Sequence, residues 1–122
     1  PEYINVAIQN GYDVEIDVRF KNSQFYLGHD FAEYKVDESF LLNKKIWCHA
    51  KDVDALHNLK KINAHFFWHQ QDDVTLTSKG YFWTYPGKLL TKNSICVLPE
   101  VGKDKKIDCA GICSDFIKDY KK

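Results

Sequence analysis

Neither sign of charge predominates in this sequence, because 17 lysines and arginines are balanced by 17 aspartates and glutamates. A chain without a basic surplus is not expected to have nucleic acid or an anionic membrane as its main partner. The sequence also lacks any apolar run approaching the roughly 20 residues that cross a bilayer. We therefore expect no stable membrane insertion.

No two cysteines form a C-x-x-C pair. Cys48, Cys96, Cys109 and Cys113 all lie in apolar, strand-like runs, which favours buried free thiols in a reducing compartment, the cytoplasm, over disulfides. A structural zinc site is not expected, because no second pair of cysteines or histidines completes Cys109 and Cys113. The chain begins at Pro1 without a methionine, which we interpret as the loss of an upstream segment.

Internal repeats, low-complexity tracts and linkers are also missing, so we predict one domain over residues 1–122. Most strand-like runs are continuously apolar with short connections, which favours a parallel sheet of the α/β class. Strands are predicted over residues 13–20, 25–29, 45–50, 64–69, 81–85, 94–98 and 107–114. Helices are predicted over residues 2–9, 53–62 and 115–120, with a polar loop over 31–40 and a turn over 72–78.

Two acids stand out on the first predicted strand. Glu15, Asp17 and Arg19 share one face of it, since side chains alternate across a strand. Neighbouring carboxylates repel each other and lose hydration, so they need a cation or strong hydrogen bonds. A second short strand then delivers His29 and Asp30, and oxygen ligands beside an imidazole suit metal-assisted hydrolysis. Two alternatives stay open: the acids line a solvated strand face, ion-paired with Arg19, and His29 is a surface histidine.

The stretch DVEIDVRF…FYLGHD resembles the glycerophosphodiester phosphodiesterase and phosphatidylinositol phospholipase C-like superfamily, whose second strand carries E-x-D followed by H-D. The opening P-E-Y helix and the late segment IDCAGICSDF are similar to the family as well. The resemblance implies a TIM barrel, which needs about 250 residues. We therefore expect a compact or incomplete TIM-type (β/α) barrel with several helices shortened or absent.

The first strand of the family, with its H-R-G motif, has no counterpart here, so we expect the N-terminal strand to be missing. A barrel without that strand exposes the edges of residues 13–20 and 107–114, and bare strand edges invite pairing. The expectation that follows is a homo-oligomer, or a strand supplied from elsewhere.

The resemblance implies that Glu15 and Asp17 bind a divalent metal ion, Mg²⁺ or Ca²⁺ first and Mn²⁺ next. His49 stands where the family has a metal-binding Glu, and it shares a strand face with Lys51, so it can complete the ligand set. An imidazole ligand favours Mn²⁺ or Zn²⁺ over Ca²⁺. Lys51 matches a family lysine and is expected to neutralise a phosphate oxygen.

The same resemblance implies that His29 protonates the leaving alcohol as general acid. Arg19 and His69 are predicted to bind substrate; for His69 the alternative of an ordinary strand-end residue stays open. His57 and His65 are interpreted as surface histidines.

Three functions compete at this stage. The first is a metal-dependent phosphodiesterase-like hydrolase acting on a small glycerol- or sugar-linked phosphodiester. The second is a non-catalytic binding or scaffold relative that has lost the catalytic His-Arg strand. The third is a barrel fragment that is active only when paired with another copy or with its missing strand.

Overall fold

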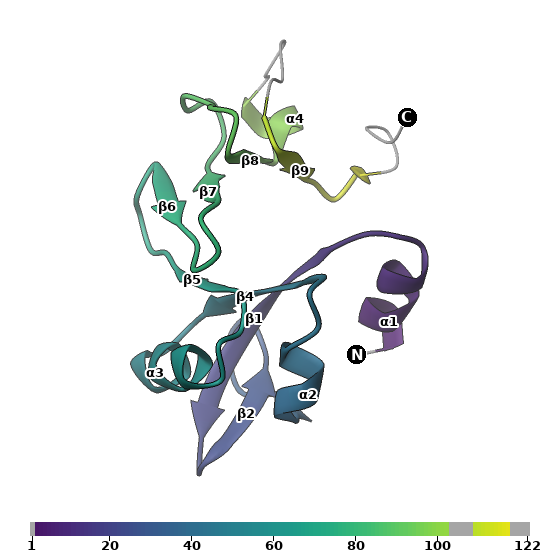
Figure 1. The fold of residues 1–122 in the computed structure, drawn as a ribbon, viewed down its shortest axis with the longest axis vertical. Helices are drawn as coiled ribbons and strands as arrows, with labels where there is room; N and C mark the ends of the chain where they lie inside the picture. The colour runs from purple at the N-terminus through teal and green to yellow at the C-terminus, as the bar shows by residue number, and fades with distance from the viewer. Residues whose placement is uncertain (1, 103–108, 118–122) are drawn as a thin grey trace. The chain divides into compact units, whose positions relative to one another are not determined.

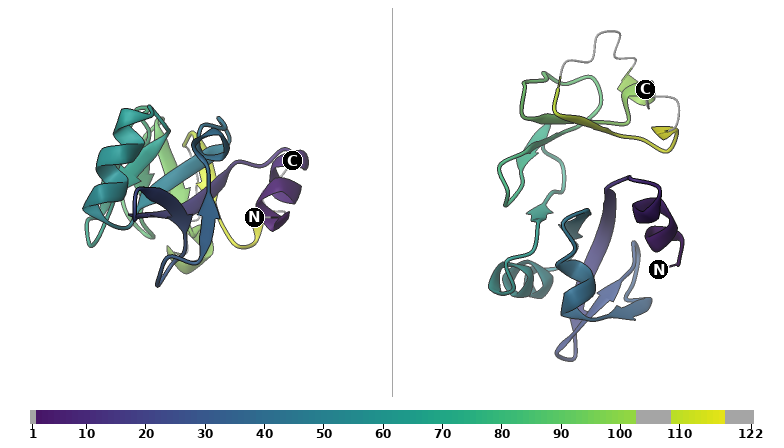
Figure 2. Two further views of the ribbon diagram at one scale, coloured as in Figure 1. Left: turned by 90° about the horizontal axis from the view of Figure 1, so that it is seen from below. Right: turned by 45° about the vertical axis from the view of Figure 1, so that its right-hand side comes forward.

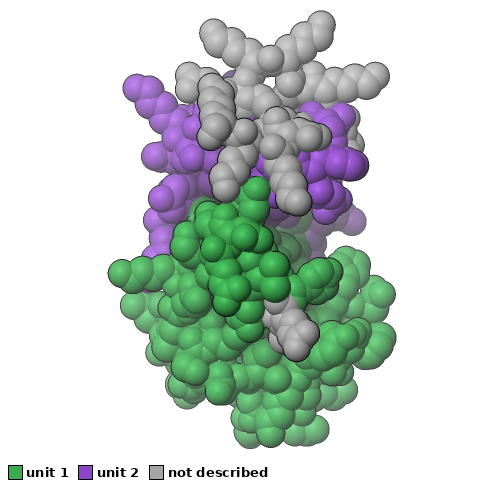
Figure 3. Space-filling model, turned by 90° about the vertical axis from the view of Figure 1, so that its right-hand side faces the viewer, with its two compact units in different colours: residues 1–69 green, residues 70–122 purple. Residues whose placement is uncertain are grey.

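A computed structural model describes residues 2–102 and 109–117 of the chain. The chain divides into two compact units, residues 1–69 and 70–122 (Figures 1, 2 and 3). No helix among the described residues is long and apolar enough to cross a membrane.

The first unit is built on a five-stranded mixed sheet with the order β3-β2-β1-β4-β5. Its strands are β1 (Val14–Lys21), β2 (Gln24–Leu27), β3 (Tyr34–Val36), β4 (Ile46–Ala50) and β5 (Phe66–Trp68). β1, β4 and β5 run parallel, whereas β2 and β3 run antiparallel. The reversal into β2 takes two residues, Asn22 and Ser23, with φ of 51° and 62°. Two left-handed residues in a row are typical of the type I′ turn of tight hairpins.

Three helices accompany this sheet: α1 (Glu2–Gln9), α2 (Glu38–Leu41) and α3 (Val53–Lys61). The helices predicted over residues 2–9 and after Asp52 are confirmed. Gly11 follows α1 at a φ of +87°, and the Asp52 carboxylate caps α3 by accepting a 2.7 Å hydrogen bond from the Ala55 amide. The loop predicted over residues 31–40 is wrong in part, because β3 and the start of α2 lie there.

The two faces of β1 and β4 differ in chemistry. Ile16 and Val18 on β1, with Cys48 and Ala50 on β4, are buried in the hydrophobic core of the unit. Helix α3 packs against β1, β4 and β5. Because side chains alternate along a strand, the intervening residues project from the opposite face, where the acids lie.

The second unit contains a four-stranded mixed sheet with the order β6-β7-β8-β9. Its elements are β6 (Val74–Leu76), β7 (Phe82–Thr84), β8 (Ser94–Val97), the short helix α4 (Pro99–Gly102) and β9 (Gly111–Cys113). β6 and β7 form an antiparallel hairpin, and β7, β8 and β9 run parallel. β6 lies where the sequence predicts a turn. Parts of the strand predicted over 107–114 and of the terminal helix lie outside the described residues.

The predicted compact or incomplete TIM-type barrel is wrong. The described strands form two separate mixed sheets, with only a few short helices, and no closed barrel. A (β/α) barrel repeats a helical crossover after every strand, but here hairpins follow β1 and β6, and the segment between β7 and β8 has no helix. The edge expected at residues 13–20 is also wrong, because β1 lies between β2 and β4. β9, in contrast, ends its sheet in the described part of the chain.

Candidate metal centre

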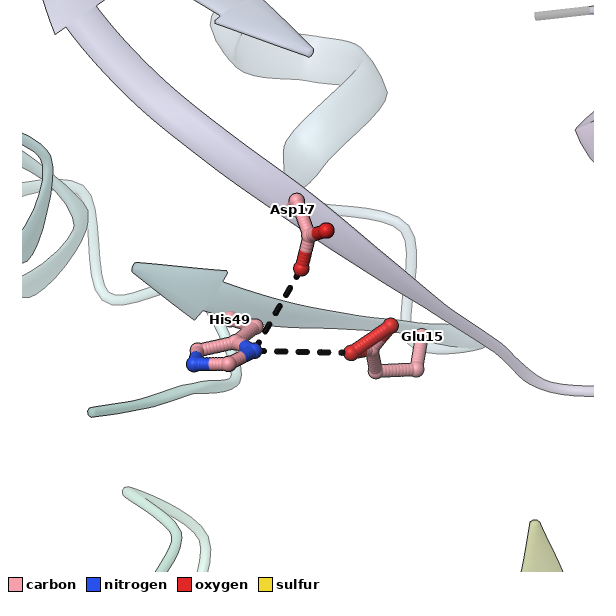
Figure 4. Close-up of side chains that lie close together, drawn as sticks. All are labelled: Glu15, Asp17 and His49. Carbon is pink, nitrogen blue, oxygen red and sulfur yellow. Dashed lines mark ion pairs between the residues drawn. The ribbon is translucent and has the colours of Figure 1, made fainter. Parts of the chain in front are cut away.

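Two adjacent parallel strands bring the candidate ligands together. In the pairing of β1 with β4, Asp17 lies directly opposite His49, and Glu15 lies opposite Trp47. Residues opposite each other in a sheet project from the same face. Glu15, Asp17 and His49 therefore meet on one face, as Figure 4 shows.

The three side chains are close enough to share one ion. His49 Nδ1 lies 3.3 Å from Asp17 Oδ1 and 3.7 Å from Glu15 Oε2, and one donor atom from each residue falls within 4.8 Å of the other two. All three side chains are largely shielded, with exposed fractions of 26% for Glu15, 15% for Asp17 and 13% for His49. Among the described residues, this is the group with the geometry to hold a metal ion.

The electrostatics of the cluster follow from this proximity. Burial would lower the pKa of His49, but hydrogen bonds to Asp17 and Glu15, with smaller contributions from the His69 backbone and the Glu15 charge, raise it to about 9. Burial likewise opposes ionisation of Asp17, yet the hydrogen bond and charge of His49 outweigh it and lower the pKa of Asp17. Without a metal, His49 is thus an imidazolium between two carboxylates at neutral pH.

The opposite side of the His49 ring is also held in place. Nε2 lies 3.2 Å from the backbone carbonyl oxygen of His69, which can only accept, so Nε2 carries a proton. The ring stacks on Phe67 with a centroid separation of 4.9 Å and an interplanar angle of 18°. Histidines that bind metals commonly donate their second N–H to a carbonyl in this way. Nδ1 is thereby the ring nitrogen left to face the acids.

This donor set of two carboxylates and one imidazole suits Mn²⁺ or Zn²⁺ better than the harder Mg²⁺. An ion about 2.1 Å from each donor holds neighbouring donors about 3.0–3.5 Å apart, and the 3.3 Å and 3.7 Å separations from Nδ1 are close to that range. Two carboxylates balance the charge of the ion. Three protein donors leave positions for water or substrate, as in catalytic sites. The imidazole disfavours Ca²⁺, which takes oxygen ligands.

Two residues predicted for the phosphate chemistry, Lys51 and His29, lie near Asp17. Lys51 follows β4, two residues after His49, and its amide donates to the Val18 carbonyl at 2.9 Å. His29 lies in the segment after β2, with its side chain 77% exposed and its Nδ1 3.0 Å from Asp30 Oδ1. After the effects of burial and His49, the charges of Lys51 and His29 lower the pKa of Asp17 further. Both groups therefore lie within electrostatic reach of Asp17.

The two residues predicted to bind substrate have backbone contacts instead. The Arg19 guanidinium donates to the carbonyl oxygens of Gly28, at 2.9 Å, and His29, at 2.6 Å. His69 contributes its carbonyl to the site, whereas its ring centroid is 6.5 Å from that of His49. Substrate binding by either side chain stays a prediction.

Sequence reasoning missed the aromatic part of this face. Phe67 is buried beneath His49, and His65, interpreted as a surface residue, is instead buried with its ring 4.0 Å from that of Trp47. The Trp47 indole N–H donates to Asp13 Oδ2 at 3.0 Å. Alternation along β5 could have found Phe67, because residues 65, 67 and 69 share one face in a strand.

Comparison with known proteins gives no match: no family model, no curated protein and no solved structure is similar to the chain. Nothing in these comparisons indicates the glycerophosphodiester phosphodiesterase superfamily, and that resemblance stays a prediction from the residues.

Proposed function

We propose that the chain is a metal-dependent hydrolase of small phosphodiesters, and that its site is the face formed by β1 and β4. The observation that carries the proposal is the convergence of Glu15, Asp17 and His49, with Lys51 and His29 beside them. The similarity of residues 13–30 to glycerophosphodiester phosphodiesterases supports the substrate class, a glycerol- or sugar-linked phosphodiester.

Each residue then has a defined task in hydrolysis. Glu15, Asp17 and His49 hold the ion, which supplies Lewis-acid stabilisation of the phosphoryl oxygens when bound. The Lys51 ammonium neutralises a phosphate oxygen. Water oxygen bonds to phosphorus and releases a proton to solvent, the bond from phosphorus to the alcohol oxygen breaks, and His29 donates the proton that the leaving alkoxide needs before solvent reprotonates it. The contact of His29 Nδ1 with Asp30 leaves Nε2 for that transfer.

A second candidate, a non-catalytic binding relative, is favoured by one specific observation. The pKa of His49 is raised, from 6.5 to about 9, by its carboxylate neighbours. An imidazolium already balances the charge of one acid, so the cluster can persist as an ion pair without any metal. Metal binding and turnover must therefore be measured separately.

The first test is calorimetric titration of the metal-free protein with Mn²⁺, Mg²⁺ and Ca²⁺. We expect one Mn²⁺ per chain, and at least about tenfold weaker binding in Asp17→Asn and Glu15→Gln, since each loses a charged ligand. His57→Gln, an exposed histidine on α3, is the control and should bind as the wild type does. Binding of equal strength in all four proteins would refute the site.

The second test compares hydrolysis of glycerophosphocholine with that of bis-p-nitrophenyl phosphate. Loss of a general acid slows the release of a poor leaving group most, so His29→Ala should lower kcat about 10²–10⁴-fold on glycerophosphocholine and far less on the nitrophenyl ester. Asp17→Asn should abolish turnover of both. Mn²⁺ binding without hydrolysis of either substrate would favour the non-catalytic relative.

We also propose that the chain works in a reducing compartment such as the cytoplasm. The four cysteines are free thiols, with Cys48 and Cys96 buried. Burial, with the nearby Glu15 charge, raises the pKa of Cys48 to about 12, so this thiol is protonated and unreactive.

A further inference from the structure

Arg19 joins the end of β1 to the segment that carries His29. It lies on the same face of β1 as Asp17, two residues further along. Its Nε donates to the Gly28 carbonyl at 2.9 Å and its Nη2 donates to the His29 carbonyl at 2.6 Å. A guanidinium makes such paired bonds because its donors lie in a rigid plane.

The same segment is fixed at two further points. The Gly28 amide donates to the Asp17 carbonyl at 3.1 Å, and the Glu33 amide donates to the Leu27 carbonyl at 2.9 Å. A Cβ atom on Gly28 would lie 1.7 Å from the Phe31 carbonyl oxygen, so the backbone folds back more tightly than any other residue allows. The position of the His29 backbone is therefore set by contacts with residues 17 and 19.

The side chain of His29 itself is weakly held. It is 77% exposed, and its ring contacts the equally exposed Asp30. An exposed side chain reaches the site reproducibly only if its backbone is held in place, since a misplacement of about 1 Å can cost two orders of magnitude in rate. The bond from Arg19 Nη2 is a side-chain contact with the His29 backbone, and the bond from Arg19 Nε holds the residue before it.

We propose that Arg19 is a positioning residue, whose paired bonds to the Gly28 and His29 carbonyls hold His29 beside the acids. The inference rests on the proposed function for its catalytic consequence, but not for the anchoring itself. It differs from a substrate-binding role, in which the loss of Arg19 would raise KM whether or not His29 is present.

The variant Arg19→Lys tests the paired bonds, because lysine keeps the charge but cannot span two carbonyls with a planar fork. Arg19→Met removes both the charge and the donors while it keeps most of the apolar stem. Lys21→Met is the matched control, because it removes an exposed cation two residues further along the same strand. Circular dichroism establishes that each variant is folded.

The first measurement is amide hydrogen exchange on the full chain, which requires no turnover. We expect the Gly28 and Glu33 amides to exchange at least about tenfold faster in Arg19→Lys and faster still in Arg19→Met. Amides on β4 should be unchanged, and so should all of these amides in Lys21→Met. Wild-type exchange at Gly28 and Glu33 in both Arg19 variants would overturn the proposal.

The second measurement is a kinetic cycle with His29→Ala on glycerophosphocholine. We expect Arg19→Lys to lower kcat by about tenfold or more, with KM within about threefold of the wild type. In the His29→Ala background the same change should have no further effect, because a residue that acts only through His29 loses its influence when His29 is gone. The positioning role would be overturned if Arg19→Lys lowered kcat by the same factor with and without His29. It would also be overturned if Arg19→Met raised KM and left kcat unchanged.

The two measurements distinguish a failure of the proposed function from a failure of the inference about Arg19. If the wild-type protein hydrolyses neither substrate, the proposed function falls, and hydrogen exchange alone decides whether Arg19 holds the His29 segment. If hydrolysis occurs but exchange does not respond to Arg19, the function stands and the inference falls.

Discussion

In the proposed site, the ion pair and the metal ion compete for one nitrogen atom of His49. Nδ1 faces Asp17 and Glu15 at 3.3 Å and 3.7 Å, where a proton on it completes an ion pair and a lone pair on it can bind a metal ion. Metal binding must therefore release the proton, and affinity should rise with pH as the imidazole gives it up. Nε2 can donate to the His69 carbonyl both when Nδ1 carries a proton and when Nδ1 binds a metal ion.

The raised pKa of His49 predicts a pH dependence of the metal-free protein. The folded pKa of about 9 exceeds the ordinary value of 6.5, so the contribution of His49 to stability is complete below pH 6.5 and is lost as pH rises through 9. The pKa of Asp17 lies below 3.8, so its contribution is lost at the acid end. We expect the difference in unfolding free energy between the wild type and His49→Gln to shrink from pH 6.5 to 9.5.

Urea denaturation in the presence of a chelator measures this difference at each pH. His57→Gln is the control, and its difference from the wild type should not follow the same course. A difference for His49→Gln that is constant between pH 6 and 10 would mean that the ion pair with Asp17 and Glu15 does not form.

The tight hairpin of β1 and β2 makes the first sheet a mixed one, because β2 runs antiparallel to β1 while β4 runs parallel to it. Its turn residues, Asn22 and Ser23, both have positive φ, a conformation that costs an L-residue other than Gly, Asn or Asp roughly 1–2 kcal/mol. Because the hairpin is closed so tightly, β2 occupies the sheet position next to β1 and returns the chain toward the acids. His29 comes two residues after the end of β2, next to Gly28, whose amide donates to the Asp17 carbonyl.

Ser23→Gly should stabilise the protein by about 0.5–1 kcal/mol, since Asn-Gly is the preferred pair for a type I′ turn and glycine adopts positive φ without a steric cost. Urea denaturation of the full chain measures the change. Ser39→Gly is the matched control: Ser39 lies inside α2, so glycine there should destabilise by about 0.5 kcal/mol. A lower midpoint for Ser23→Gly would show that this turn is not of the type I′ form in solution.

At the largest scale, the chain consists of two units, and every candidate site residue belongs to the first. Glu15, Asp17, His29, His49 and Lys51 all fall within residues 1–69. That unit also has its own hydrophobic core, made by one face of its sheet together with residues of α2 and α3. The proposed metal site therefore lies within this unit.

A fragment of residues 1–69 should fold and bind Mn²⁺ within about threefold of the full chain. Its stability should be lower, because a domain of about 60 residues buries a smaller share of its surface than a larger one. Circular dichroism and calorimetric titration test both expectations. A folded fragment that does not bind Mn²⁺, although the full chain does, would show that the site needs residues beyond 69.

Local patterns in the sequence predicted most of the secondary structure correctly. Periodic apolar residues and the caps at Gly11 and Asp52 predicted α1 and α3, and continuous apolar runs predicted β4 and β8. β3 and β6 were missed, because a strand of three residues with exposed positions carries too little apolar periodicity to be recognised. The barrel was wrong for a different reason: similar strands and a similar motif do not specify how the strands pair.

Alternation along β1 was enough to place Glu15 and Asp17 on one face, because that regularity is built into any extended backbone. The family resemblance pointed to His49 as a third ligand, but only strand pairing decided the contacts across that face. The register of β1 with β4 set His49 opposite Asp17, and β5 put Phe67 and the His69 carbonyl against the imidazole. Contacts between segments far apart in the chain depend on which edges meet, and that choice is made by the packing of the folded unit.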